Sequence, residues 1–425
     1  MTTVVMVPPG QNGLTASGPS RARRDRGKHR WMRLYHPGGP RCNGRRARAR
    51  CCAAWRDYAT NAAAPACEPP PRRPVKTTMQ TPLSDTTVLA IGTCVEVDAP
   101  ARLHLGFVDL HGGLGRRFAS IGMAISDLAT VVRATHAEAI TTEGPGAERA
   151  EAHARRVLEQ AGISSGVRIG IERAIPEHAG LGSGTQLALA VGTAVAALHG
   201  LRLEPAEIAF GAQRGARSGV GIGVFERGGF VLDGGRGRAT RVPPVLSRMP
   251  FPDAWRALLV FDERRSGLHG ARESVAFAQL QSMPAPVAAD IARTVVMQLL
   301  PALAEHDFDA FATAVGSIQR GVGAHFAGPQ GGWIASPDVA EVVHWLMARG
   351  FAGVGQSSWG PTGFAFLRSE AEAQGLAAQA RERWHAAPHL RFHVCRGRNE
   401  GARIDVTAAV PPAHAALARI PRGGR

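Results

Sequence analysis

The sequence predicts an α+β fold built in two layers. Segments with strand-like alternation and segments with helical spacing follow one another along residues 87–406, and no internal repeat is visible. With 425 residues, the chain is long enough for two ordinary domains, each with a sizeable core. A cluster of prolines at residues 243–252 interrupts the pattern, so we expect the domain boundary there.

The first 78 residues differ from the rest of the chain in charge. They hold 16 of the 50 Lys and Arg residues but only three of the 34 Asp and Glu residues, so most of the net charge of +16 lies there. Low hydrophobicity with high charge predicts disorder, so we expect residues 1–86 to form a disordered basic extension. We favour Met79 as the true start, with an over-extended reading frame upstream; a nucleic-acid or membrane-surface arm is the alternative. Residues 411–425 are expected to be a short tail.

Residue usage excludes several kinds of chemistry. Four of the six cysteines lie in the N-terminal extension, and Cys94 and Cys395 have no CxxC partner, so neither a zinc site nor a disulfide framework is expected. No lysine follows Lys76, which excludes Schiff-base catalysis and a Walker-type lysine for the core. No segment approaches the roughly 20 apolar residues of a membrane span. We therefore expect a cytoplasmic protein without a nucleic-acid or membrane partner.

In the first domain, residues 87–245, strands and helices are expected to alternate. Residues 87–97 and 101–110 have the pattern of two strands, separated by an Asp-Ala-Pro break. Gly162 and Gly200 each follow a helical pattern, as is usual at a helix end. The other expected elements are strands at 121–134 and 167–175 and within 221–234, and helices at 147–160, 187–199 and 205–215.

The second domain, residues 246–410, is expected to open on a strand at 255–262. A short Gly-rich segment at 351–357 precedes a buried strand at 363–367. Strands at 390–395 and 402–406 are expected to close the same sheet. Helices are expected at 285–305, 308–322, 339–350 and 374–384.

A glycine-rich segment points most directly to function: Pro176-Glu-His-Ala-Gly-Leu-Gly-Ser-Gly-Thr-Gln186, followed at once by a long run of helix formers. Glycine lets the backbone approach a ligand closely, and the first amides of a helix lie unpaired at its positive end. A Gly-rich turn that enters a helix is therefore a cradle for phosphate oxygens, although a structural helix cap is the simpler alternative. The expected phosphate-binding residues here are Gly180, Gly182, Ser183, Gly184 and Thr185.

Two further blocks flank this segment: Ala99-Pro-Ala-Arg-Leu-His-Leu-Gly-Phe-Val-Asp109 and Gly353-Val-Gly-Gln-Ser-Ser-Trp-Gly-Pro-Thr362. The order of the three blocks resembles the GHMP kinase superfamily over about residues 93–407. The resemblance implies a two-domain GHMP-kinase-like fold, with a ribosomal protein S5 domain 2-like N-terminal domain and a ferredoxin-like C-terminal domain. Many of these kinases have Ser-Gly-x-Asp after the loop helix, and the aspartate is proposed as their base. Here Gly221 stands in its place, which argues against a kinase.

Residues 102–110, 218–226, 318–332 and 353–362 more closely resemble the β-ribofuranosylaminobenzene 5′-phosphate synthases. That family joins phosphoribosyl pyrophosphate to 4-aminobenzoate or 4-hydroxybenzoate and releases pyrophosphate and CO₂. The resemblance implies a Mg²⁺-dependent pentosyltransferase of tetrahydromethanopterin biosynthesis that forms a homodimer; it leaves the acceptor and the metal ligands open. An ATP-dependent GHMP-type small-molecule kinase is the main alternative. A catalytically inactive sensor of a phosphorylated metabolite is the other.

This reaction needs a pyrophosphate cradle and fixed positive charge rather than a strong base. We expect Arg102 to contact phosphate, with Arg116 and Arg117 as further candidates. We expect Trp359 or Phe225 to lie near the arene and Asp109 or Glu226 to lie near Mg²⁺. The residues expected near the ribose phosphate are Gln319, Arg320, His325 and Gln330. The expected catalytic residues are Asp109, His104 and Ser218, and the expected substrate-binding residues are Gln356, Ser357, Ser358, Trp359 and Thr362. Each has a structural alternative: a turn for Asp109, a core position for His104, a β-bulge for Ser218 and a buried turn for residues 357–359.

Overall fold

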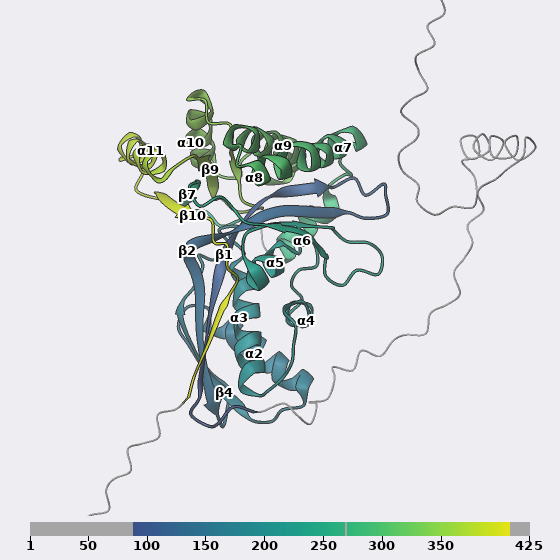
Figure 1. Ribbon diagram of the computed structural model, residues 1–425, viewed down its shortest axis with the longest axis vertical. Helices are drawn as coiled ribbons and strands as arrows, with labels where there is room; N and C mark the ends of the chain where they lie inside the picture. Colours follow the sequence, from purple (N-terminus) through teal and green to yellow (C-terminus); the bar gives the residue numbers. More distant parts are fainter. Residues whose placement is uncertain (1–87, 268–269, 409–425) are drawn as a thin grey trace, which may run out of the picture. The chain divides into compact units, whose positions relative to one another are not determined.

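The computed structural model describes residues 88–267 and 270–408, whose arrangement is shown in Figure 1. These residues belong to one compact unit, Thr77–Arg425. The expected N-terminal extension and C-terminal tail lie outside the described residues.

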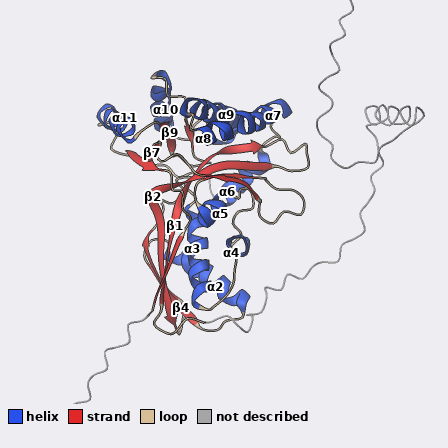
Figure 2. Ribbon diagram, viewed as in Figure 1, coloured by secondary structure: helices blue, strands red, loops and turns tan. Residues whose placement is uncertain are grey.

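The first half of the chain, together with β11 from the second half, forms a seven-stranded sheet with helices packed on one face (Figure 2). Its order is β11-β1-β2-β4-β3, with β5 paired to β2 and β6 to β5. The strand pairs are antiparallel except β3 with β4. The strands are β1 (Cys94–Asp109), β2 (Phe118–Ala137), β3 (Thr141–Glu143), β4 (Gly166–Arg173), β5 (Phe230–Asp233), β6 (Val245–Met249) and β11 (Arg403–Thr407). The helices are α2 (Ala147–Ala161), α3 (Ser183–Leu198), α4 (Pro205–Gly211) and α5 (Val220–Arg227).

Strand β1 is shared between two hydrophobic cores. Val95 and Val97 are buried with α2 and α3, whereas Leu103 and Leu105 are buried with the helices of the second half. The expected break between strands 87–97 and 101–110 is therefore wrong. Pro100 stays in register with Ala129 of β2, and the irregularity that follows it is absorbed as a bulge within one continuous strand.

The second half is built on a four-stranded antiparallel sheet in the order β10-β7-β9-β8. Its strands are β7 (Arg256–Asp262), β8 (Val354–Gln356), β9 (Gly363–Leu367) and β10 (Leu390–Arg396). Its helical elements are α6 (Gly270–Gln279), α7 (Ala285–Thr294), the π-helix η1 (Val295–Leu299), α8 (Leu300–Glu305), α9 (Phe308–Gln330), α10 (Pro337–Ala348) and α11 (Glu370–Arg383). Helix α6 and strands β3 and β6 have no counterpart among the elements expected from the sequence.

Helices α7 and α8 and the π-helix between them form one continuous segment, Ala285–Glu305. Within the described residues it is the one helix long and apolar enough, by length and composition, to cross a membrane. The segment contains Asp290, Arg293 and Glu305, so it is not a run of roughly 20 apolar residues, and the expectation that the chain has no such run is not contradicted. Ile291, Val295 and Leu299 on one face of the segment are buried in the core that also contains residues of β1 and α9.

Two expected strands are placed differently by the structure. Residues 220–227 form helix α5, and the Asp233 carboxylate accepts the Gly219 amide at the helix start, at 2.8 Å. Strand β11 pairs with β1 and not with β10. The expectation that 390–395 and 402–406 close one sheet is therefore wrong, since the chain returns to the first sheet after β10.

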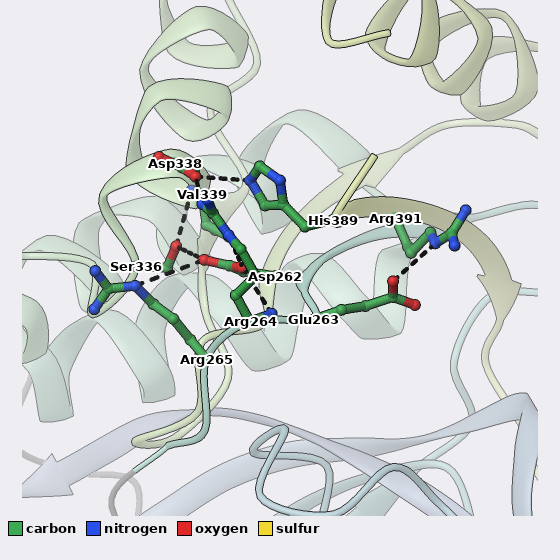
Figure 3. A network of polar contacts seen from close by, with 9 residues as sticks. All are labelled: Asp262, Glu263, Arg264, Arg265, Ser336, Asp338, Val339, His389 and Arg391. Atoms are coloured by element: carbon green, nitrogen blue, oxygen red, sulfur yellow. Dashed lines mark hydrogen bonds and ion pairs between the residues drawn. The ribbon is translucent and has the colours of Figure 1, made fainter. Parts of the chain in front are cut away.

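A polar network holds the end of β7 against the start of α10 (Figure 3). The Ser336 hydroxyl donates to the buried Asp262 carboxylate at 2.7 Å and accepts the Val339 amide at 3.3 Å, which caps α10. Burial alone would raise the pKa of Asp262, but hydrogen bonds from Ser336 and the Arg264 amide, with the Arg264 charge, hold that pKa below its usual value. Next to this cap, the Ala335 amide donates to Gln356 Oε1 at 2.6 Å, so the network also fixes β8.

The stability of the fold is expected to fall as the pH drops below about 6.5, the usual pKa of histidine in an unfolded chain. Burial, with the charges of Arg214, Arg156 and Arg149, lowers the pKa of His153 to about 4. Between these two values the unfolded state binds a proton that the folded state does not, so acidification favours unfolding. Urea unfolding at pH 7.5, 6 and 5 measures how the free energy of unfolding changes with pH. In His153→Gln this free energy should fall less on acidification. An unchanged pH dependence would contradict the role assigned to His153.

Candidate functional site

The three sequence blocks meet at the N-terminus of α3, where residues 180–186 form the Gly-rich loop. Gly182 is the N-cap of α3 with φ of 82°. The Ser357 hydroxyl donates to the Gly180 carbonyl at 2.8 Å and accepts the His104 amide at 3.0 Å. A Cβ on Gly180 would lie 2.2 Å from the Ser357 carbonyl oxygen. Glycine is therefore needed where the C-terminal block crosses the loop.

Two arginines place guanidinium groups at this end of α3. Arg102 Nη1 donates to the Gly180 carbonyl at 2.6 Å. The guanidinium carbon of Arg214 lies 3.3 Å from where a Cβ on Gly184 would be. Burial lowers the pKa of Arg102 to about 10, partly offset by Glu273, so the group remains charged at neutral pH. Partly desolvated cations beside the positive end of a helix favour an anion at this site.

Arg214 and Arg217 are functional candidates that sequence reasoning missed. Both follow α4 in a segment without a recognisable motif. Arg217 Nη1 contacts Glu273 Oε1 of α6 at 3.0 Å. Only the folded arrangement brings Arg214 beside Gly184 and Arg217 against Glu273, and no local pattern could have found them.

A small cavity is lined in part by residues of the C-terminal block, whose Ser357 contacts the Gly-rich loop. Its volume is about 20 Å³, room for about one water molecule. The rings of Phe326 and Trp359 lie 4.4 Å apart between centroids in its wall. The lining residues are His104, Gly106, Phe107, Gln319, Val322, Gly323, Phe326, Gln330, Trp333, Gln356, Ser358 and Trp359.

Several buried polar atoms at the cavity have no hydrogen-bond partner among the described residues. These atoms are both ring nitrogens of His104 and Nε1 of Trp359. The His104 side chain is 2% exposed, and burial together with the Arg102 charge holds the pKa of its imidazole well below the usual value. Because buried polar groups are normally hydrogen-bonded, a neutral imidazole and an indole N–H are here available to a ligand.

Several of the residues predicted as site residues come together here. His104, Gln356, Ser358 and Trp359 line the cavity, as do Gln319 and Gln330. Ser357 joins the loop to β1, and the buried Thr362 accepts the Ser357 amide through its carbonyl at 3.0 Å. Ser183 and Thr185 lie in the first turn of α3. Arg320 and His325 are both on α9 but are not among the cavity-lining residues.

Other predicted residues have structural partners elsewhere. The Asp109 carboxylate accepts the amides of His111 and Gly112 at 2.7 and 2.8 Å, which is the turn role named as its alternative. The Ser218 and Ser120 hydroxyls share a hydrogen bond of 2.6 Å. Ser120 in turn donates to Asp233, whose pKa is raised by burial. Neither Asp109 nor Ser218 lines the cavity.

Phe225 and Glu226, the other candidates for the arene and the metal, do not line the cavity, and neither do the phosphate candidates Arg116 and Arg117. Phe225 is buried in the core with α2 and α3 because residues 220–227 are helical, and the Glu226 backbone lies against Gly401. Arg116 donates to the carbonyls of Gly234 and Gly235, each at 2.8 Å. Arg117 lies near enough to His325 for its charge to contribute to lowering the pKa of that imidazole, after burial.

The described residues do not build a magnesium site by themselves. They contain no group of three or more His, Cys, Asp or Glu side chains able to hold a metal ion. Asp109 is engaged by its own turn. Glu273, whose charge acts on both Arg102 and Arg214, is ion-paired with Arg217.

Gly221 lies directly against the first turn of α3. A Cβ there would be 3.1 Å from Thr185 Cγ2, and the Gly221 carbonyl accepts Gln186 Nε2 at 2.8 Å. An aspartate side chain at this position would require Thr185 to move. The position that carries the base in many GHMP kinases is thus packed closely against Thr185.

Comparison with known proteins agrees with this geometry. The GHMP kinases N terminal domain matches residues 148–226, and the GHMP kinases C terminal domain matches residues 299–386. The β-ribofuranosylphenol 5′-phosphate synthase of Archaeoglobus fulgidus is 31% identical over 324 residues, which cover 72% of this chain and 98% of the relative. The chain belongs to the β-ribofuranosylphenol 5′-phosphate synthase family.

Within the β-ribofuranosylphenol 5′-phosphate synthase family, the protein of Methanothermobacter thermautotrophicus is 29% identical over 330 residues, 72% of this chain and 97% of its own. Among solved structures, homoserine kinase from Cytophaga hutchinsonii matches with a TM-score of 0.54 at 20% identity, covering 73% of this chain and 97% of that one. This likeness concerns the fold alone. The family resemblance and the α+β GHMP-kinase-like fold predicted from the sequence are confirmed.

Proposed function

We propose that this chain is a pentosyltransferase that joins phosphoribosyl pyrophosphate to a 4-substituted benzoate, with release of CO₂ and pyrophosphate. One observation carries the proposal: two residues of β1, two positions apart, lie at the two parts of the site, the Gly-rich loop and the aromatic-walled cavity. Arg102 lies at the Gly-rich loop, and His104, two residues on, lines the cavity. Relatives named for a phenol product make 4-hydroxybenzoate the first acceptor to test, with 4-aminobenzoate as the second.

At the anion site, the leaving group is pyrophosphate. Arg102, Arg214 and the unpaired amides at the start of α3 offer fixed positive charge where negative charge develops as the anomeric C–O bond breaks. No strong base is needed for this step, in keeping with Gly221. Mg²⁺ enters the proposal only as an ion that accompanies pyrophosphate, because magnesium is often held by substrate phosphates rather than by a protein cage.

At the aromatic end, a ring carbon of the acceptor forms the new bond to the ribose, and its carboxylate leaves as CO₂. The electrons of the broken carbon–carbon bond restore the aromatic ring. Walls such as Phe107, Phe326 and Trp359 exclude water that would otherwise capture the ribosyl cation. The neutral His104 offers the substrates one N–H donor and one acceptor nitrogen.

The test measures ¹⁴CO₂ released from carboxyl-labelled 4-hydroxybenzoate and 4-aminobenzoate, with and without phosphoribosyl pyrophosphate. Release that depends on phosphoribosyl pyrophosphate supports the proposal. ATP with homoserine or mevalonate is the parallel assay for the kinase alternative. ADP formation without CO₂ release would overturn the pentosyltransferase, and saturable pyrophosphate binding without either turnover would favour a sensor. A homodimer, cytoplasmic location and a role in tetrahydromethanopterin biosynthesis stay predictions.

A further inference from the structure

Phe277 of helix α6 is enclosed by four aromatic rings and an arginine. Its side chain is 9% exposed. The four rings meet it at interplanar angles of 80–87°, with centroid distances of 5.2–6.0 Å. The guanidinium carbon of Arg217 lies 4.3 Å from the Phe277 centroid. We call the surrounding side chains the aromatic cage: Phe107, Phe118, Phe326, Trp359 and Arg217.

The aromatic cage belongs to the same site as the Gly-rich loop. Phe107, Phe326 and Trp359 line the small cavity beside the loop. That cavity, at about 20 Å³, is far too small for a benzene ring. A ring can therefore enter this region only by displacing a side chain, and Phe277 is the phenyl ring that the other aromatic side chains and Arg217 surround.

The same face of α6 also carries a carboxylate. Glu273 precedes Phe277 by four residues, so the two side chains project from one face of the helix. Glu273 contacts Arg217 at 3.0 Å, and its charge acts on Arg102 and Arg214 at the Gly-rich loop. Helix α6 thus presents an anion to Arg217, near enough for its charge to act on Arg102 and Arg214, and a phenyl ring to the aromatic cage.

We propose that the ring of the benzoate acceptor binds in the aromatic cage that Phe277 fills here, and that Glu273 and Phe277 hold the two substrate subsites until the substrates displace them. The proposal rests on the proposed function for the identity of the ring. A guanidinium over the ring face favours an electron-rich arene, which a 4-hydroxyl or 4-amino substituent provides. The opposite side of α6 faces outward, since Val275 is 54% exposed, so the helix can move away without breaking a second core.

The first experiment empties the aromatic cage in the full-length protein. Phe277→Ala is expected to lower the acceptor KM by about tenfold, because less of the protein has its subsite blocked, with kcat within twofold of wild type. Calorimetry should detect binding of phenol to this variant and not to wild type. Phe277→Leu, which keeps more of the packing, should shift the acceptor KM in the same direction by less.

Phe210→Ala is the matched control, because Phe210 is also a phenylalanine with an arginine over its face but is 49% exposed. It should change neither acceptor KM nor phenol binding. A tenfold rise of the acceptor KM in Phe277→Ala and Phe277→Leu would make Phe277 a wall of the pocket and overturn the proposal. Phenol binding needs no turnover. The aromatic cage is therefore tested even if neither benzoate is a substrate. The absence of turnover with both benzoates would contradict the proposed function but not the proposal for the cage.

The second experiment removes the carboxylate with Glu273→Gln and uses inorganic pyrophosphate as the probe, without added metal. Tighter pyrophosphate binding, by about three- to tenfold, is expected once the arginines lose a competing anion. Weaker binding would show that Glu273 supports the bound anion rather than competing with it. That outcome would overturn the role assigned to Glu273.

Discussion

Gly182→Val is expected to abolish measurable turnover with phosphoribosyl pyrophosphate, a loss of at least 100- to 1,000-fold, the scale of removing an oxyanion-type donor. Gly182 adopts a φ of 82°, and a Cβ there would lie 2.8 Å from Arg102 Cγ. The substitution therefore displaces Arg102 and the first amides of α3 together. Steady-state kinetics and pyrophosphate calorimetry measure the loss.

Gly162→Val provides the control for backbone strain. Gly162 ends α2 with a φ of 68°, and a Cβ there would meet nothing within 4 Å. Its variant has a comparable conformational cost without a contact at the site. Equal losses of activity in the two variants would assign the effect to folding. Unchanged pyrophosphate affinity in Gly182→Val would show that the Gly-rich loop is not the phosphate site.

His104→Leu is expected to reduce activity by about 100-fold or more, the scale of losing a positioned proton-transfer group, while making the protein more stable. The imidazole is 2% exposed and neither ring nitrogen has a hydrogen-bond partner among the described residues. An apolar side chain of similar size removes that unsatisfied polar group, a gain of about 1–3 kcal/mol. Urea unfolding measures the expected gain in stability, and kinetics on the same preparation measure the expected loss of activity.

His199→Leu is the control for the expected loss of activity and gain of stability in His104→Leu. His199 is 7% exposed, its Nε2 also lacks a partner among the described residues, and it lies at the opposite end of α3 from the Gly-rich loop. It should retain full activity. A His104→Leu variant that is both active and less stable would make His104 a core residue and no more.

The parts of the site that sequence could predict are those whose function is local. The Gly-rich loop was predictable because its glycines, hydroxyls and following helix are contiguous, and the C-terminal block because Ser357, Ser358 and Trp359 lie beside glycines. Asp109 shows the limit of such reasoning, since a carboxylate before a Gly-Gly turn has the same pattern whether it serves a turn or a metal. In the structure, the Asp109 carboxylate accepts two amides of that turn.

The rest depends on tertiary packing. Residues 220–227 have enough glycines to be taken for strands and turns, and only the close approach of Gly221 to Thr185 and of Gly223 to Val231 shows why a helix needs them. Arg214 and Phe277 reach the site from segments with no motif. Strand β11 pairs with a strand about 300 residues earlier in the chain. The pattern of residues 402–406 predicts a strand but does not indicate which strand it pairs with.

That last pairing has a consequence for how the protein is made. β11 is an edge strand of the first sheet, and its partner β1 is near the beginning of the described chain. During synthesis from the N-terminus, the Cys94–Asp98 edge of β1 has no partner until Arg403–Thr407 has left the ribosome. An unpaired strand edge is a template for association with other chains. The nascent protein is therefore most exposed to misassembly throughout the synthesis of its entire second half.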